Sequence, residues 1–477
     1  MRWKGGLVPV RTDTRSKLWT ALSVRAWCVG AVLLTAYFAV LLALMDSRPL
    51  WLDEVLQLEG TTRSNWRNVI QYVFVNPGGA PLGYLAQHWI IAIAGCSIWT
   101  ARALSAVAGA GCLLLYAAVA HRLGFRGAAV TIAISSWAVC PLAVRYSLEG
   151  RPYMQGLFFA LAAVAAQLYL ARTGRIHAAI VLGVCLVAAL YSQPFAVFAP
   201  LGFSACQVAQ SRNSRCAVLT FAAYALAGLS FVPWLILATP AWHQTIAHIP
   251  GGFVWSPSLA LVLLRECVGD GYPAAAPALL LAIAGAVAIA RRPFRDRRLP
   301  LAAAVLASVG LALAADARFH YFFAARQLIY MVPFLLLLAA EGLTMLWARP
   351  RLRAPAVVLA GVFLIAAVHK DYVHLRDRSE DWGKLSQHLT AAARGGCILL
   401  PGDSASELGL YTVFSPGIAH QICDPALSSA RIVIPLHPYV DREAAIRAEH
   451  TLLARGMTHV GGERVGFASI ELFAKRD

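Results

Sequence analysis

Two adjacent carboxylates, Asp53 and Glu54, stand directly after Trp51 and Leu52, where the first long apolar segment of the chain has ended. A carboxylate in such a place can act as a general base towards a hydroxyl nucleophile, or it can bind a cation. The same pair could instead be structural, with Asp53 capping a short helix towards Glu59 and Glu54 favouring the dipole of its first turn. The pair alone leaves both interpretations open.

A second group of polar side chains, Arg145, Glu149, Arg151 and Tyr153, occupies a short connection between two apolar segments. Such a connection needs no charges of its own, and arginine is well suited to bidentate recognition of phosphate. We therefore favour a phosphate site here over interface anchoring by arginine and tyrosine. Glu149 and Tyr153 could orient an acceptor or, together with Glu54, hold a divalent cation.

Arg326 is a third candidate. It begins a late apolar segment and follows the polar cluster 316–321. It is expected to be a further phosphate ligand, and a purely positional anchor at the end of a helix is an equally good interpretation.

The composition decides which elements must position these residues. Of 477 residues, 59% are apolar and only 14% are charged, whereas soluble domains usually carry about 25% charged residues. Repeated apolar segments are long enough to cross the roughly 30 Å hydrocarbon core of a bilayer. The chain is therefore predicted to be a polytopic α-helical membrane protein.

Basic clusters between the apolar segments predict the topology, because cytoplasmic loops are enriched in Lys and Arg. Placing every cluster and the N-terminus, 1–25, in the cytoplasm accounts for the net charge of +17, so no nucleic-acid partner is needed. The membrane domain, 26–369, then contains about eleven transmembrane helices. The predicted spans are 26–45, 100–120, 127–143, 153–171, 178–193, 194–209, 216–238, 274–290, 299–315, 326–347 and 355–369.

The first outer loop, 46–81, is predicted to carry the catalytic carboxylates and a helix. Trp66, Val69, Ile70, Val73 and Phe74 recur with helical spacing on one face. This pattern fits a helix lying in the membrane interface, and equally one packed on other parts of the protein. The apolar stretch 82–95 is short and is expected to form a juxtamembrane or re-entrant helix on the same outer face.

From residue 370 to residue 477 the hydropathy falls, and helical and β-like stretches alternate. This alternation predicts a small extracytoplasmic α/β domain with no catalytic motif of its own. Cys397 and Cys423 lie within it and could pair. No spacing of Cys and His residues indicates a zinc site. The expected elements are the helices 379–394 and 441–455 and the strands 397–400, 431–435, 458–460 and 467–473.

Several motifs together resemble the GT-C superfamily of membrane glycosyltransferases. They are the Trp51–Glu54 opening and the stretches 76–84, 102–105, 149–153 and 326–342. The branch that fits best contains protein O-mannosyltransferases and lipid A aminoarabinose transferases (glycosyltransferase family 39-like). The chain differs from this branch at Gly79–Leu82, where relatives often read Pro-Pro-Leu, and at Arg326-Gln327, where they read Arg-Tyr. The resemblance therefore names no sugar and no acceptor.

The resemblance implies an enzyme that transfers a hexose or pentose from a polyprenyl-phosphate donor to a hydroxyl of an envelope lipid, glycan or protein. Transfer would occur outside the membrane with inversion, and Asp53 would match the catalytic acidic residue. Arg151 and Arg326 would lie near the donor. The resemblance also implies a bacterial inner membrane, with the N-terminus cytoplasmic and the C-terminus periplasmic.

A transporter or lipid flippase of envelope precursors is the alternative function. Transporters place ionisable residues near the bilayer midplane and often contain internal repeats. In this chain the notable charges lie at predicted helix ends on one face and no repeat is visible, which favours the enzyme.

Overall fold

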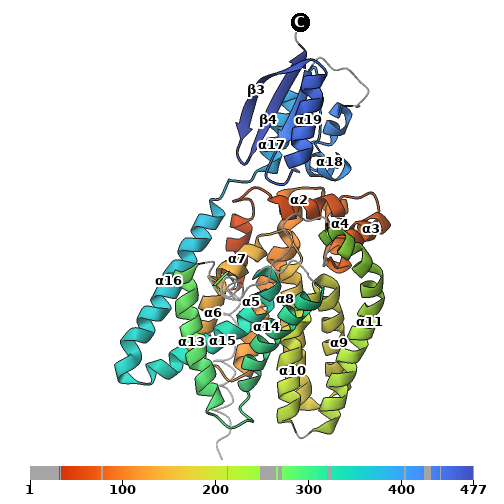
Figure 1. The fold of residues 1–477 in the computed structure, drawn as a ribbon. Helices are drawn as coiled ribbons and strands as arrows, with labels where there is room; N and C mark the ends of the chain where they lie inside the picture. The colour runs from red at the N-terminus through yellow and green to blue at the C-terminus, as the bar shows by residue number, and fades with distance from the viewer. Residues whose placement is uncertain are drawn as a thin grey trace, which may run out of the picture.

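The computed structural model contains a helical domain that carries a smaller α/β domain at one end (Figure 1). It describes Val32 and residues 34–76, 79–211, 213–247, 265–266, 271–319, 325–401, 404–423, 431–440 and 442–475. The N-terminal segment 1–25, predicted to be cytoplasmic, lies outside these residues.

Within the described part of the chain, seven helical segments are long and apolar enough to cross a bilayer, and a bent pair makes a possible eighth. The polytopic helical class is thus confirmed, whereas the predicted number of eleven spans is not. The seven are α5 (Ile98–Arg122), α8 (Tyr153–Thr173), α11 (Ser214–Ala247), α13 (Tyr272–Ala290), α14 (Leu299–Phe319), α15 (Val332–Trp347) with the preceding 3₁₀ segment η2 (Ala325–Met331), and α16 (Arg353–Leu375) with η3 (Pro350–Leu352).

A proline explains why one predicted span is broken. The predicted span 127–143 is the bent pair α6 (Ala128–Ala138) and α7 (Pro141–Ser147), whose axes differ by 53°. Pro141 has no N–H to continue the hydrogen bonds of α6, so the helix stops and restarts in a new direction. The predicted spans 178–193 and 194–209 are shorter helices, α9 (Ile176–Ser192) and α10 (Phe198–Gln210), separated by η1 (Pro194–Val197).

The bend also corrects the position of Arg145. The sequence placed this residue in a loop, but in the structure it belongs to the last turn of α7. The connection from α7 to α8 therefore begins only after Ser147.

Helix α15 forms the centre of the helical domain, since every residue from Val332 to Leu343 is buried. A helix that is apolar all round is stable only when it is surrounded. Its closest neighbour is α13: a Cβ on Gly285 would collide with the carbonyl of Leu338, and one on Gly342 would collide with the carbonyl of Leu281. Glycines let the two backbones approach, as in other membrane helix pairs.

Three helices of the first outer loop and its continuation cover one end of this domain: α2 (Leu52–Thr61), α3 (Trp66–Val75) and α4 (Pro81–Ala94). Val69 and Val73 of α3 are buried, and they cluster with Tyr84 of α4 and Trp234 of α11. The sequence allowed α3 to lie in the membrane interface or to pack on other parts of the protein. For Val69 and Val73 the structure shows packing on the protein. The predicted helix at 82–95 is present as α4.

The C-terminal domain has a four-stranded sheet in the order β1-β2-β4-β3, in which only β1 and β2 are parallel. The predicted strands and the two predicted helices are confirmed, although α16 continues through the predicted boundary at residue 370. Helix α18 and η4 were not foreseen. The elements are α17 (Trp382–Ala392), β1 (Cys397–Ile398), α18 (Ser404–Thr412), η4 (Pro416–Gln421), β2 (Arg431–Leu436), α19 (Arg442–Ala454), β3 (Met457–Val465) and β4 (Ala468–Lys475).

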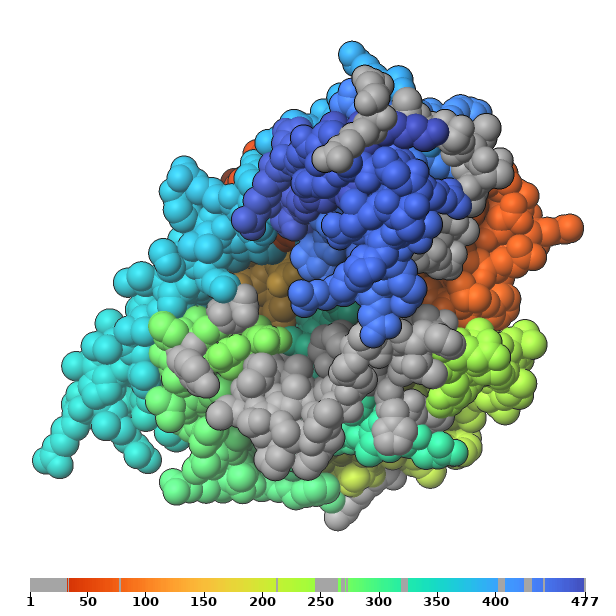
Figure 2. Space-filling view, turned by 45° about the horizontal axis from the view of Figure 1, so that its top comes forward, coloured from red at the N-terminus to blue at the C-terminus, as the bar shows by residue number. Residues whose placement is uncertain are grey.

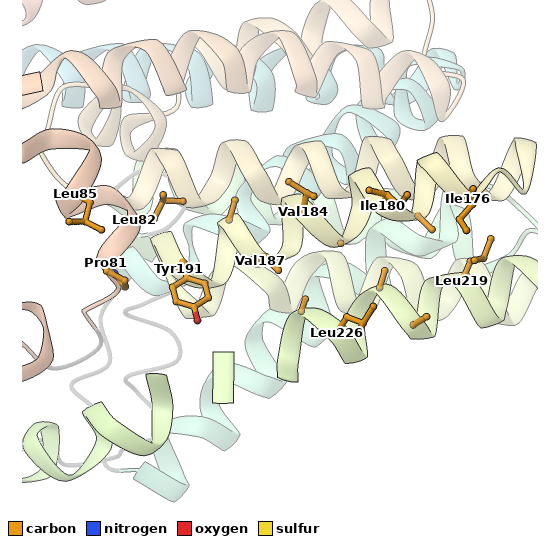
Figure 3. A pocket seen from close by; sticks show the side chains of 16 residues that line it. Pro81, Leu82, Leu85, Ile176, Ile180, Val184, Val187, Tyr191, Leu219 and Leu226 are labelled. Carbon is orange, nitrogen blue, oxygen red and sulfur yellow. The ribbon is translucent and has the colours of Figure 1, made fainter. Parts of the chain in front are cut away.

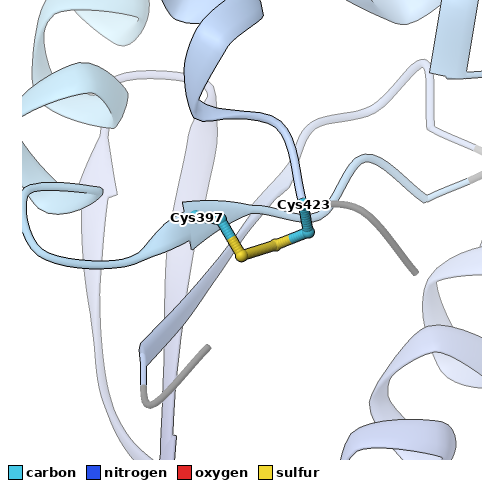
Figure 4. The surroundings of a disulfide bond; sticks show 2 residues. All are labelled: Cys397 and Cys423. Carbon is cyan, nitrogen blue, oxygen red and sulfur yellow. A yellow bond between two sulfur atoms is a disulfide. The ribbon is translucent and has the colours of Figure 1, made fainter. Parts of the chain in front are cut away.

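A disulfide between Cys397 and Cys423 joins β1 to the segment that follows η4 (Figure 4). The sequence left this pairing open. Figure 2 shows the C-terminal domain, in blue, covering the end of the helical domain that carries the outer-loop helices, in orange. Trp382 and Leu385 of α17 share a buried apolar cluster with Val55 and Leu58 of α2. The α/β domain is thus packed directly on the loop that holds the two carboxylates.

Candidate active site

The N-terminus of α2 positions both carboxylates. The helix begins at Leu52, with Trp51 as the residue before its first turn. Glu54 reaches back to the backbone N–H of Trp51, at 3.5 Å, in the manner of a capping box. Asp53 is therefore not the cap of this helix, as the structural interpretation had it, but the second residue of the first turn. Its carboxylate favours the helix dipole from there.

Asp53 forms an ion pair with Arg326, whose Nη1 lies 2.8 Å from Asp53 Oδ2. The two side chains are 17% and 22% exposed, so both are partly accessible to a substrate. Arg326 is in η2, directly before α15. The fold thus brings together two of the residues singled out from the sequence.

Arg145 and Arg326 line one cavity of about 260 Å³, together with Trp51, Tyr146 and Lys370. The guanidinium carbon of Arg145 lies 5.3 Å from the centre of the Trp51 ring, a cation–π distance. Two arginines on the walls of a single cavity suit the recognition of a phosphate.

A neighbouring cavity of about 390 Å³ shares Trp51, Arg145 and Lys370 with the first one. It extends towards the C-terminal domain, because Glu380 in the linker to that domain also lines it. The two cavities together form a polar, partly enclosed space whose basic side chains slightly outnumber its acidic ones. The basic residues are Arg48, Arg145, Arg326, Lys370 and Arg376, and the acidic ones are Glu266, Asp371, Asp377 and Glu380.

Glu149 is buried beside this space. Its Oε1 accepts a hydrogen bond from Arg145 Nε at 2.7 Å and lies 3.8 Å from Arg48 Nη1. Burial raises the pKa of Glu149, and the positive charge of Arg145 opposes that rise. Oε2 of Glu149 has no hydrogen-bond partner among the described residues. Glu149 therefore orients Arg145 and keeps one oxygen for another donor.

Glu54, expected to be catalytic, is occupied by a different contact. It is fully buried and forms a bidentate ion pair with Arg102, with distances of 2.7 Å and 2.6 Å. Its Oε1 also accepts from the backbone N–H of Gly150 at 2.7 Å. Because both oxygens are engaged, this geometry favours a structural role in which Glu54 ties α2 to α5 and to the connection before α8.

Arg102 was part of a sequence motif but was not chosen as a site residue. It also donates to the backbone carbonyls of Met45, Arg48 and Pro49. The sequence did contain one indication of this role. Arg102 is a single arginine in the first turns of an apolar helix, where a charged side chain usually pairs with an opposite charge.

Arg151 holds the opposite side of α2. Its Nη1 lies 3.3 Å from three acceptors: the carbonyl of Asp53, Oε1 of Gln57 and the hydroxyl of Tyr84. Its guanidinium carbon is 5.9 Å from the ring centre of Tyr153, which is buried. Arg151 is not among the residues that line the basic cavities. Its position fits support of the Asp53 backbone better than direct contact with a phosphate.

An apolar groove of about 870 Å³ runs between α9 and α11 and ends at α4 (Figure 3). Its walls carry aliphatic side chains from Ile176 and Leu219 at one end to Pro81 and Leu85 at the other. Helix α4 also carries Tyr84, a hydrogen-bond partner of Arg151. The groove shares no lining residue with the two cavities, and its link to the site is this contact of α4 with Arg151.

The carboxylates of the site do not form a metal cluster. Among the described residues, no group of three or more His, Cys, Asp or Glu side chains could hold a metal ion. Asp53, Glu54 and Glu149 each pair with a different arginine instead.

The long apolar helices define a polytopic membrane protein, and its fold is similar to that of solved membrane glycosyltransferases, the class that the sequence motifs suggested. A similar solved structure is ArnT from Cupriavidus metallidurans in the apo state. It matches with a TM-score of 0.56 and 13% identity over 94% of this chain and 98% of that one. ArnT bound to undecaprenyl phosphate matches with a TM-score of 0.57 and 12% identity, covering 93% and 97% of the two chains.

The mycobacterial arabinofuranosyltransferase AftD is also similar, with a TM-score of 0.51 and 19% identity over 93% of this chain and 40% of the AftD chain. At these identities the likeness concerns the fold. No protein-family model and no curated protein sequence match the chain.

Proposed function

We propose that this protein transfers a sugar from a polyprenyl-phosphate donor to a hydroxyl acceptor at the end of the membrane domain covered by the α/β domain. The observation that carries the proposal is the shared position of Arg326. It pairs with the Asp53 carboxylate and also lines the basic cavity with Arg145. A base for the acceptor and cations for the leaving phosphate therefore lie side by side.

In the reaction, Asp53 accepts the proton of the acceptor hydroxyl while its oxygen attacks the anomeric carbon. The bond from that carbon to the phosphate oxygen breaks, and the departing lipid phosphate gains negative charge. Arg326 and Arg145 stabilise this charge, which is the kind of interaction that usually contributes most to catalysis. Attack opposite the leaving phosphate inverts the anomeric centre.

The Asp53–Arg326 pair links donor binding to activation of the base. While Arg326 holds the carboxylate, its guanidinium occupies Oδ2 of Asp53. A donor phosphate in the cavity competes for Arg326, and it thereby releases Asp53 for the acceptor hydroxyl. The enzyme would then hold its base in reserve until a donor is bound.

The apolar groove supports a lipid-linked donor over a soluble one. Its walls are aliphatic along α9 and α11, and it ends at α4, whose Tyr84 contacts Arg151. One of the similar structures, ArnT, has undecaprenyl phosphate bound. A hydrocarbon chain in the membrane and a phosphate in the basic cavity would satisfy both environments.

The site end of the domain is proposed to face the periplasm of a bacterial inner membrane. Arg122, Arg291 and Arg353 lie at the far ends of α5, α13 and α16 from the α/β domain. Positive residues at those ends indicate the cytoplasm. The proposed acceptor is an envelope lipid, glycan or protein.

The test is mass spectrometry of envelope lipids and glycans from a strain that lacks the protein, complemented in turn by wild type, Asp53→Asn and Glu59→Gln. Glu59→Gln is the matched control, since it makes the same change in the last turns of the same helix. We expect wild type and Glu59→Gln to restore a discrete sugar mass and Asp53→Asn not to restore it. Restoration by Asp53→Asn at equal protein level would refute the base assignment. A lipid-linked sugar moved but not transferred would favour a flippase.

A further inference from the structure

Glu380 connects the C-terminal domain to the helix that carries Asp53. It lies between α16 and α17, far from α2 in the sequence. Its Oε1 accepts hydrogen bonds from the backbone N–H of Leu52 at 2.6 Å and from Trp382 Nε1 at 2.7 Å. The hydroxyl of Tyr439 lies 3.3 Å from its Oε2. One half-buried carboxylate thus joins the membrane domain to two aromatic residues of the α/β domain.

The hydrogen bond from Leu52 to Glu380 is significant because Leu52 is the first residue of α2. The first N–H groups of a helix have no partner within it, and the helix dipole makes this end attract negative charge. Glu380 meets both needs from outside the helix. The next residue along the chain is Asp53, so a hydrogen bond to Leu52 restrains the backbone that carries the base.

The partners of Glu380 are themselves held in place. Trp382 is fully buried and lies in the same apolar cluster as Val55 of α2. Burial, together with the negative charge of Glu380, raises the pKa of Tyr439 to about 12. The phenol therefore remains a hydrogen-bond donor towards Glu380 across the physiological pH range.

We infer that Glu380 is a positioning residue that clamps the N-terminus of α2, so that docking of the α/β domain sets the position of the Asp53 carboxylate. This inference rests on the proposed role of Asp53. It assigns the C-terminal domain, which contains no catalytic motif, a part in the reaction at the membrane surface. A displacement of a base by a fraction of its hydrogen-bond length is enough to lower turnover strongly.

The experiment compares full-length Glu380→Ala and Glu380→Gln with Glu463→Gln. The control removes the charge of an exposed glutamate of the same domain that pairs with His388. Hydrogen exchange of the Leu52 amide reports the clamp directly, whatever the protein's activity. Turnover and KM for a polyprenyl-phosphate sugar report its effect on catalysis.

Glu380→Ala is expected to speed exchange of the Leu52 amide about tenfold and to lower kcat about tenfold. Glu380→Gln keeps an acceptor oxygen and should recover most of both. Glu463→Gln should match wild type. If Glu380→Ala does not accumulate, Glu380→Asp, with its carboxylate one methylene farther from Leu52, should show the same losses.

Unchanged protection of the Leu52 amide in the Glu380 variants would overturn the clamp. Lost protection with unchanged kcat would overturn its link to Asp53. If wild type transfers no sugar while Glu380→Ala still deprotects Leu52, the clamp stands and the proposed function fails.

Discussion

Glu54→Gln is expected to destabilise the protein by about 3–5 kcal/mol, while Asp53→Asn at the neighbouring position leaves stability nearly unchanged. Arg102 is 1% exposed, and Glu54 supplies the counter-charge for its guanidinium. Removing one partner of a buried ion pair leaves the other charge uncompensated, which costs about 3–5 kcal/mol. The Asp53–Arg326 pair is partly exposed, and breaking such a pair costs about 1 kcal/mol or less.

The expected change in melting temperature follows from the size of the chain. Unfolding entropy is about 2.1 cal/mol/K per residue, or about 1 kcal/mol/K for 477 residues. A loss of 3–5 kcal/mol by Glu54→Gln therefore lowers the melting temperature by about 3–5 °C. Asp53→Asn should shift it by about 1 °C or less.

The assay is thermal unfolding of the purified variants in one detergent, followed by tryptophan fluorescence, with activity measured in parallel. The double variant Glu54→Leu with Arg102→Leu removes both charges and should recover most of the lost stability. Glu54→Gln melting with wild type would refute the assignment of a structural ion pair. So would an equal loss of stability in Asp53→Asn.

Three further expectations follow from the geometry. Arg326→Gln should lower turnover of a lipid-linked donor by about 10²–10³. Arg326→Lys should lower it less, since lysine keeps the positive charge but loses the planar guanidinium that binds a phosphate through two N–H groups. Replacing Cys397 and Cys423 by serine should lower the free energy of unfolding of the C-terminal domain by about 3–4 kcal/mol, because the disulfide closes a 26-residue separation. Hydrogen exchange of β1 and β2 measures this loss. Cys96 is exposed at the turn between α4 and α5. A membrane-impermeant maleimide should therefore label it from the outside, as read by mass spectrometry of its peptide with Cys96→Ala as control.

Each expectation has a contrary result. Full turnover by Arg326→Gln would remove this residue from the phosphate site. Wild-type protection of β1 and β2 in the double serine variant would show that packing alone holds the domain. Labelling of Cys96 only after cell lysis would reverse the proposed orientation.

Much of the fold follows from local properties of the sequence. Apolar length predicted the helices that cross the membrane, and alternating patterns predicted the strands and main helices of the C-terminal domain. The number of spans did not follow, because hydropathy does not register where proline interrupts a helix. Pro141 lies inside the predicted span 127–143 and begins a new helical segment there, whereas Pro194 stands at the predicted boundary between 178–193 and 194–209. Arg145 consequently belongs to a helix and not to a loop.

Which charged residues would form the site was only partly visible in the sequence. Residue type and the predicted side of the membrane singled out Asp53, Arg145 and Arg326, and the structure brings these three to one place. The same reasoning gave Glu54 and Arg151 similar weight. Glu54 and Arg151 have the same chemical types as Asp53 and the cavity arginines, so residue type alone does not distinguish the two groups.

The sequence by itself determined the class of the protein, its helical membrane domain and the end at which the candidate site residues gather, because apolar length and charge distribution are local properties. Only the tertiary structure decided the partners. Arg326 reaches Asp53 across 273 residues, and Glu380 reaches Leu52 across 328. Such pairings depend on how the helices pack and where the α/β domain docks, and no pattern within a short stretch of sequence records either.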